Sequence, residues 1–391
     1  MVDGRCGLDE VLAAAEEAAP VKSIDVVSRN LRDRFGATDV SFLFLALAGQ
    51  ELVRLTGTDA SQGEGKADRV TLDGSVHDEV LRTQRPMVTP GEEGERVIAP
   101  VTNRGDVVGV LELALPRVGE GTLAQIAQAA HALAYVIVTD RRFTDLYHWG
   151  RRTTPVSLAA EIQYQLLPTA SCCEADQFTL ACALAPADDI GGDTYDYSLD
   201  RDTLHLSVTD AMGHDVDSAL LATIAVNASR GARRAGCDLA EQARQTDRAM
   251  LDHGRGAWAT GQLLRIGLDD GRAQLVNAGH PWPLRLRDGT VEEVRLRVDL
   301  PFGVHAPAPY QVQSLDVRPG DRLLLYTDGV QERAAHAVDL PALLLDTRRL
   351  HPRETVRAVV GAVLRACGNR LRDDATVLCL DWHGTHARRD P

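Results

Sequence analysis

The chain has 391 residues, which is long for a single hydrophobic core and predicts two domains. It carries 56 acidic against 42 basic residues, a net charge of −14. This balance argues against nonspecific binding to nucleic acid or to an anionic membrane, since both require a basic face. The seven cysteines include no Cys-x-x-Cys pair, which favours reduced thiols over a disulfide framework or a zinc site.

Two segments bear on where the protein works. The opening segment, MVDGRCGLDEVLAAAEEAAP, lacks the basic and apolar stretches of a signal peptide. The apolar stretch LAQIAQAAHALAYVIV is interrupted by polar residues and is too short to cross a bilayer. We therefore expect a cytoplasmic protein with no membrane partner.

The N-terminal part alternates helices and strands. Residues 8–36 predict a helix that stops near Gly36. The segments DVSFLFLAL and ELVRLTG predict paired strands, SVHDEVLRTQRPMV predicts a helix followed by a strand, and RVIAPVTNRGDVVGVLELAL predicts a hairpin. From residue 121 to about residue 147, apolar residues recur at helical spacing.

In this arrangement residues 1–120 resemble a GAF domain. The segment GSVHDEVLRTQRPMV is similar to the helix and strand that border the ligand cup of that family, and VIAPVTNRGDVVGVLELAL is similar to its closing hairpin. The resemblance implies an α/β sensor domain that binds a small ligand or a partner. His77 and His131 are single histidines, and a single histidine packs into a fold more often than it binds haem.

Residues 121–168 predict helical connectors. In LAAEIQYQLLPTA the apolar side chains of Leu158, Ile162 and Leu166 recur on one helical face, and Pro168 stops the helix. Helices of this type pair in parallel dimers. We therefore expect a homodimer in which this linker carries signals between the domains.

After Pro168 the sequence becomes rich in strands, and carboxylates stand where strands begin or end. Each one alone is ordinary, because Asp-Gly is a common turn and an aspartate before a strand is often a cap. Together they favour hard divalent cations, which take oxygen ligands and can neutralise a charge at a strand tip. The segments are DDIGGDTYDY with Asp193, LSVTDAMGHD with Asp210, DRLLLYTDGVQE with Asp328, and RDDATVLCLDW with Asp373 and Asp374.

Six motifs then give a specific resemblance. GGDTYDY, VTDAMGH, NAGHPWPL, LPFGV, GDRLLLYTDGVQER and RDDATVLCL occur in the order found in SpoIIE/RsbU-type serine phosphatases, the bacterial branch of the metal-dependent PPM protein phosphatases. LAAEIQYQLLPTA resembles the helix that precedes this catalytic domain. The resemblance implies an α+β chain with a GAF-like domain, an α-β-β-α sandwich of two antiparallel sheets over residues 169–383, and a flexible tail at 384–391.

The resemblance also implies the reaction. Two divalent cations, manganese or magnesium, would hold a water that attacks phosphoserine or phosphothreonine on a phosphorylated regulatory protein of the STAS type. His214 could give a proton to the leaving alkoxide, although a structural role in the turn is the stronger interpretation, and we interpret His280 as scaffold. The implied metal ligands are Asp193, Asp210, the backbone carbonyl of Ala211, Asp328 and Asp373, with Asp374 as the alternative to Asp373.

One residue departs from the family pattern. After Gly213 and His214 the family has glycine, and here Asp215 stands just before the helix predicted from DSALLATIAVNASR. Aspartate is favoured at a helix N-terminus, so we expect the change to be tolerated. Two other functions stay open: a non-catalytic signalling scaffold with a degraded metal site, and a metal-dependent hydrolase of small phosphoesters.

Overall fold

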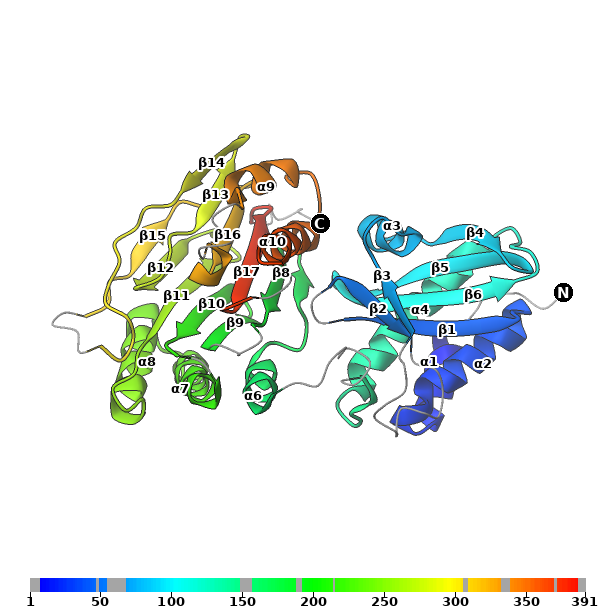
Figure 1. Cartoon of the computed structure of the whole chain (residues 1–391), viewed down its shortest axis with the longest axis horizontal. Coiled ribbons are helices and arrows are strands. Elements are labelled where there is room, and N and C mark those ends of the chain that lie inside the picture. Colours follow the sequence, from blue (N-terminus) through cyan, green and yellow to red (C-terminus); the bar gives the residue numbers. More distant parts are fainter. Residues whose placement is uncertain are drawn as a thin grey trace. The chain divides into compact units, whose positions relative to one another are not determined.

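The fold divides into two compact units, residues 1–155 and residues 156–391, which are described separately (Figure 1). The structure is a computed structural model. It describes residues 8–46, 49–54, 68–147, 157–187, 192–213, 215–304, 309–331, 338–368 and 371–385.

The N-terminal unit is an antiparallel sheet with helices on both faces. The strand order is β3-β2-β1-β6-β5-β4. The strands are β1 (Asp39–Leu45), β2 (Glu51–Arg54), β3 (Asp68–Thr71), β4 (Met87–Gly91), β5 (Gly94–Asn103) and β6 (Asp106–Leu115). The helices are α1 (Leu8–Glu17), the 3-10 helix η1 (Pro20–Lys22), α2 (Ser23–Phe35), α3 (Val76–Thr83) and α4 (Thr122–Asp140).

Each face of this sheet has its own apolar layer. Helices α1, α2 and α4 cover one face, where Leu31 and Leu133 pack with Leu111, and α3 covers the other, where Val80 packs with Leu43 (Figure 1). The predicted strand pair is β1 with β2, and the predicted hairpin is β5 with β6, so both predictions are confirmed. Because apolar layers cover both faces of the sheet, β6 is buried along most of its length and shows little of the alternation of polar and apolar residues expected of a half-exposed sheet.

The helix predicted over residues 8–36 is wrong as a single element, because it consists of α1, η1 and α2. Pro20 causes the interruption, since a residue before proline is pushed out of the helical region, and Ala19 is extended at φ −63° and ψ 141°. The predicted stop is confirmed: Gly36 ends α2 in the left-handed conformation at φ 64°.

Helix α4 is long and apolar enough to cross a membrane by length and composition. Its apolar side chains include Ile126, Leu133 and Ile137, which are buried against the sheet, and core helices of soluble proteins pass the same test. The range 121–168, expected to be a helical linker, is divided between the units: α4 packs in the N-terminal core, and α6 (Leu158–Leu166) packs against α7 and β9 of the C-terminal unit.

The C-terminal unit has two antiparallel sheets. The five-stranded sheet, in the order β15-β12-β11-β10-β9, contains β9 (Gly192–Leu199), β10 (Thr203–Ala211), β11 (Ala259–Gly267), β12 (Ala273–Ala278) and β15 (Gln313–Leu315). The six-stranded sheet, in the order β14-β13-β16-β17-β8-β7, contains β7 (Cys172–Glu174), β8 (Phe178–Ala185), β13 (Leu284–Arg287), β14 (Thr290–Glu293), β16 (Arg322–Tyr326) and β17 (Ala375–Trp382).

Helices cover the outer face of each sheet. Their bounds are α7 (Asp215–Arg234) and α8 (Leu239–His253) on the five-stranded sheet, and α9 (Leu340–Asp346) and α10 (Pro352–Ala366) on the six-stranded sheet (Figure 1). Alternation along the strands explains the layers, because Leu378 and Leu380 of β17 face the core between the sheets while Val377 and Cys379 face α10. The predicted α-β-β-α sandwich is confirmed.

Candidate functional site

Asp193 and Asp210 lie side by side on neighbouring strands. Asp193 is the second residue of β9, Asp210 is the last but one of β10, and the two form a register pair in the antiparallel ladder. Residues directly opposite each other in such a ladder point to the same face, with Cβ atoms about 5 Å apart. The fold therefore brings these two predicted ligands together at one end of the five-stranded sheet.

Asp196 belongs to the same acidic segment but not to this site. It lies three positions after Asp193, so its side chain leaves the opposite face of β9. There it accepts hydrogen bonds of 2.8 Å from both Arg230 and Arg233 of α7. This buried ion pair anchors α7 to the sheet and leaves Asp193 as the carboxylate on the other face.

The six-stranded sheet supplies the other aspartates. Asp328 begins the 3-10 helix η3 (Asp328–Val330) directly after β16, and Asp373 and Asp374 directly precede β17. Because β16 and β17 are antiparallel neighbours, with Tyr326 opposite Val377, the two acidic segments meet at the same end of this sheet.

Burial and the charges of the aspartates on the two sheets raise the pKa values of Asp193 and Asp210. Burial and, after it, the charges of Asp328, Asp373 and Asp374 together raise the pKa of Asp210 to about 7. Burial, together with the charges of Asp210 and Asp374, also raises the pKa of Asp193 well above its usual range. Aspartates from both sheets thus form one acidic edge, defined by Asp193, Asp210, Asp328, Asp373 and Asp374.

A threonine joins the two sheets at this edge. The Thr327 hydroxyl donates to Asp193 Oδ2 at 2.6 Å and accepts from the backbone N–H of Thr376 at 3.0 Å. Thr327 is fully buried, so these bonds are shielded from water. Thr327 was not among the predicted site residues, although its place before the Asp328-Gly329 turn was a signal that could have drawn attention to it.

The structure distinguishes Asp373 from Asp374. Asp374 is 1% exposed, and both of its carboxylate oxygens accept hydrogen bonds: Oδ1 from the Ala187 N–H at 2.9 Å and Oδ2 from the Gln163 amide at 2.6 Å. Asp373 is only half-buried, and its Oδ1 accepts from the Asp374 N–H at 2.9 Å. Asp374 is therefore engaged in holding the backbone, whereas Asp373 lies on the accessible side.

Two glycines permit the close approaches at the edge. Gly192 lies opposite Ala211 in the ladder, and a Cβ on Gly192 would collide with the Ala211 carbonyl oxygen. A Cβ on Gly329 would collide with the carbonyl oxygen of Asp374. The second glycine of GGD and the glycine of TDG are thus required by backbone packing, and Ala211 follows Asp210 as the last residue of β10.

The remaining predicted residues are His214, Asp215 and His280. His214 lies outside the described residues. Asp215 begins α7 with φ at 67°, in the left-handed region that favours glycine. His280 is buried and shares a 2.9 Å hydrogen bond with Thr260, the register partner of Asp210. Burial lowers the pKa of His280 to about 4, which keeps the ring neutral and is consistent with the interpretation as scaffold.

The side chains of the acidic edge are of the chemical type that binds divalent cations. The acidic edge offers carboxylate oxygens, which magnesium and manganese prefer, and its mutual repulsion would be relieved by bound positive charge. In the positions that the side chains occupy, the described residues contain no group of three or more His, Cys, Asp or Glu close enough to hold a metal ion. Binding of one ion by three or more of these carboxylates therefore requires side-chain movement.

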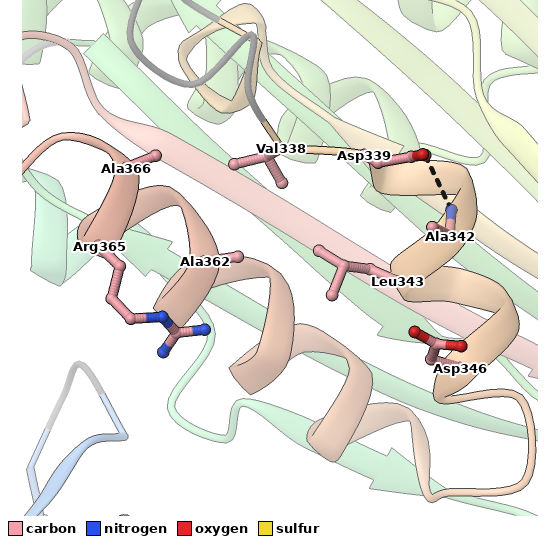
Figure 2. Close-up of a pocket in the computed structure, with 8 residues that line it drawn as sticks. All are labelled: Val338, Asp339, Ala342, Leu343, Asp346, Ala362, Arg365 and Ala366. Atoms are coloured by element: carbon pink, nitrogen blue, oxygen red, sulfur yellow. Dashed lines mark hydrogen bonds between the residues drawn. The ribbon is translucent and has the colours of Figure 1, made fainter.

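Two cavities are lined by residues other than those of the acidic edge. A groove of about 320 Å³ runs between α9 and α10, and Asp339 at one end caps α9 by accepting from the Ala342 N–H at 3.0 Å (Figure 2). A more polar cavity of about 390 Å³ in the N-terminal unit is lined by Arg54 and Glu112. Near it His77 hydrogen-bonds Glu112, so this histidine is held by a carboxylate in the fold.

The α-β-β-α sandwich is the fold that the resemblance to PPM phosphatases implied. The family described as Stage II sporulation protein E (SpoIIE) matches residues 200–383. This match, which covers just under half of the chain, shows that residues 200–383 are similar to the SpoIIE family.

Two curated proteins are similar in sequence to part of this chain. The phosphoserine phosphatase RsbP of Bacillus subtilis is 27% identical over 183 residues, which are 45% of this chain and 44% of RsbP. The phosphoserine phosphatase RsbU of the same organism is 21% identical over 233 residues, which are 58% of this chain and 69% of RsbU. The chain thus spans less than half of RsbP.

Among solved structures, the RsbU and RsbW domains of a Mycobacterium tuberculosis protein align with a TM-score of 0.48. The identity is 26%, over 54% of this chain and 61% of that one.

Proposed function

We propose that the chain is a metal-dependent protein serine/threonine phosphatase. The observation that carries the proposal is the acidic edge, where Asp193 and Asp210 of one sheet interact electrostatically with Asp328, Asp373 and Asp374 of the other. A structural role alone does not account for it, since burying several like charges together is costly without a compensating cation. The curated relatives RsbP and RsbU, both named phosphoserine phosphatases, support the same activity.

In this proposal two divalent ions, manganese or magnesium, bind at the edge. Asp193, Asp210, Asp328 and Asp373, with the carbonyl oxygen of Ala211, would hold them. When bound, such ions supply a water of lowered pKa and stabilise charge on the phosphoryl oxygens. Asp374 is the alternative ligand, but its two hydrogen-bonded oxygens favour a positioning role.

The protein residues provide the geometry of the reaction. Asp193 and Asp210 are fixed by the β9–β10 ladder, and Thr327 fixes the Asp193 carboxylate from the second sheet. Residues on rigid strands lose little freedom when a substrate binds, which lowers the cost of reaching the reactive geometry. For His214 a structural role in the turn stays the stronger interpretation, and donation of a proton to the leaving serine or threonine oxygen is the alternative.

The proposed substrate is phosphoserine or phosphothreonine on a regulatory protein, of the STAS type by family resemblance. The N-terminal unit would act as a GAF-like sensor that responds to a small ligand or partner and regulates the phosphatase domain, in a cytoplasmic homodimer. Its sheet with helices on both faces and its polar cavity at Arg54 and Glu112 support a binding role.

A phosphoserine-peptide assay tests the proposal. We expect release of phosphate by the full-length chain with Mn²⁺ and none with a chelator. Asp328→Asn should lower the rate by roughly 100-fold or more, because it removes a charged metal ligand while keeping the side-chain shape. Asp288→Asn, in the exposed turn after β13 where φ is 49°, is the matched control and should leave the rate unchanged, because asparagine tolerates that conformation.

Two results would contradict the phosphatase proposal. Equal rates for the wild type and Asp328→Asn would mean that the acidic edge is not the catalytic site. No hydrolysis by a folded wild type at any metal concentration would favour the non-catalytic signalling scaffold.

A further inference from the structure

Helix α6, the first helix described in the C-terminal unit, has a glutamine on its buried face. The apolar positions Leu158 and Ile162 were expected to define that face together with Leu166, but Leu158 is 64% exposed and Ile162 only partly buried. The buried residues are Ala159, Ala160, Gln163 and Leu166, and Gln163 is fully buried. A long polar side chain is rarely placed there unless it forms hydrogen bonds.

The Gln163 amide contacts both sheets at the acidic edge. Its Nε2 donates to the backbone carbonyl of Asp193 at 2.6 Å and to Asp374 Oδ2 at 2.6 Å. Asp193 belongs to β9 of the five-stranded sheet, and Asp374 directly precedes β17 of the six-stranded sheet. One side chain therefore fixes the separation of two strands that carry the acidic edge.

The chemistry of the contact sets the orientation of the amide. A flipped amide would place its oxygen against a carbonyl and a carboxylate, three acceptors with no donor, so the NH₂ group must face them. Both hydrogens of that group are then used. The Oε1 atom is buried and has no hydrogen-bond partner in the described part of the chain, which indicates that the side chain is placed for its two donated bonds.

Glutamine also suits the charge of its surroundings. An arginine or lysine here would add a fixed positive charge to the acidic edge and compete with a bound cation, whereas the amide donates without charge. The bond to Asp374 is a neutral donor to a charged acceptor, and with the Ala187 N–H it occupies both oxygens of that carboxylate.

We propose that Gln163 is a positioning residue for the metal centre: it holds Asp374 and the Asp193 backbone where the neighbouring carboxylates can share divalent cations. It touches no substrate and acts through these two aspartates. The inference rests on the proposed metal-dependent function and adds a residue from outside the predicted ligand set. Loss of the amide should weaken metal binding by about 10-fold or more, the usual effect of removing a group that orients metal ligands.

The test compares Mn²⁺ binding by calorimetry for the full-length wild type, Gln163→Met, Gln163→Asn and Gln165→Leu. Gln163→Met keeps the length and packing of the side chain but removes both donors. Gln163→Asn keeps the amide but is too short to reach both partners, and it serves if the Met variant does not fold. Gln165, two residues along the same helix, is exposed and bonds only Glu161 among the described residues, so it is the matched control.

We expect the dissociation constant for Mn²⁺ to rise by roughly 10-fold in both Gln163 variants and by less than about 2-fold in Gln165→Leu. In the phosphatase assay the rate should fall at limiting Mn²⁺ and recover at saturating Mn²⁺, which a general loss of folding would not produce. An unchanged dissociation constant in folded Gln163 variants, beside a wild type that binds Mn²⁺, overturns this inference alone. A wild type that binds no Mn²⁺ overturns the proposed function instead.

Discussion

Asp215 occupies a backbone conformation that most side chains avoid. Its φ of 67° lies in the left-handed region, where a Cβ costs about 1 kcal/mol and aspartate is tolerated better than most residues. Its backbone carbonyl accepts a hydrogen bond of 2.8 Å from Ser218, which ties the turn to α7. The glycine expected from the family pattern is thus replaced by one of the few residues that can keep the same turn.

Two substitutions of Asp215 separate conformation from side-chain chemistry. We expect Asp215→Gly to change the free energy of unfolding by less than about 0.5 kcal/mol, because relief of strain offsets the lost interaction with the helix dipole. Asp215→Ala should cost about 1 kcal/mol, since it keeps the Cβ and loses the polar group. Urea unfolding of the metal-free protein measures both. A more stable alanine than glycine variant would show that the backbone at this position is not left-handed.

At the scale of elements, the acidic edge depends on how closely η3 passes the start of β17. The Thr327 N–H donates to the Thr376 carbonyl at 3.1 Å, and Gly329 passes so near the Asp374 carbonyl that no Cβ fits. This contact sets the distance between the segment that carries Asp328 and the segment that carries Asp373.

Gly329→Ala should therefore destabilise the C-terminal unit by roughly 2 kcal/mol or more, because backbone on both sides must shift to admit the methyl group. The matched control is Gly231→Ala, within α7, where a Cβ meets nothing within 4 Å. That variant should gain about 0.5–1 kcal/mol from helix propensity. Thermal unfolding compares the two, and an equal gain in both would disprove the close approach at Gly329.

Sequence patterns predicted the elements that depend on local spacing. Asp193, Asp210 and Asp328 were placed at strand ends, where the structure has them, because alternation and turn residues are local signals. Gln163 could not be found in this way. Its role depends on Asp374, 211 residues away, and the pattern of Leu158 and Ile162 favoured a different buried face.

Prediction also failed where one residue interrupts a longer pattern. Helical spacing over residues 8–36 concealed the break at Pro20, which acts through the backbone of Ala19 rather than through hydrophobicity. The sequence also did not show that the predicted linker, residues 121–168, is divided between the two units. The apolar residues of α4 show that it packs, but sequence alone does not say that the partner is the sheet of the N-terminal unit.

At the scale of the whole molecule, the two units have separate cores. The core residues of the N-terminal unit end at Tyr147, and those of the C-terminal unit begin at Ala159. No apolar cluster of the described residues contains members of both units. Each unit therefore has an apolar core of its own, as a domain that can fold by itself does.

Deletion of residues 1–155 tests this arrangement and the proposed regulation together. The remaining chain should fold and hydrolyse p-nitrophenyl phosphate with Mn²⁺, because the acidic edge lies within it. Its rate should differ from that of the full-length chain by roughly 5-fold or more, the usual size of coupling between a regulatory and an active site. A folded, active fragment whose rate equals that of the full-length chain would argue against regulation by the N-terminal unit.

The most direct test of the central claim is calorimetric titration of Mn²⁺ into the full-length wild type and Asp210→Asn. Asp210 lies opposite Asp193 and is influenced by all three aspartates of the other sheet, so it is the member most dependent on a shared cation. The account predicts two Mn²⁺ ions per wild-type chain and at least a 10-fold weaker affinity in Asp210→Asn. Equal affinity in the two proteins, or no binding by a folded wild type, would contradict it.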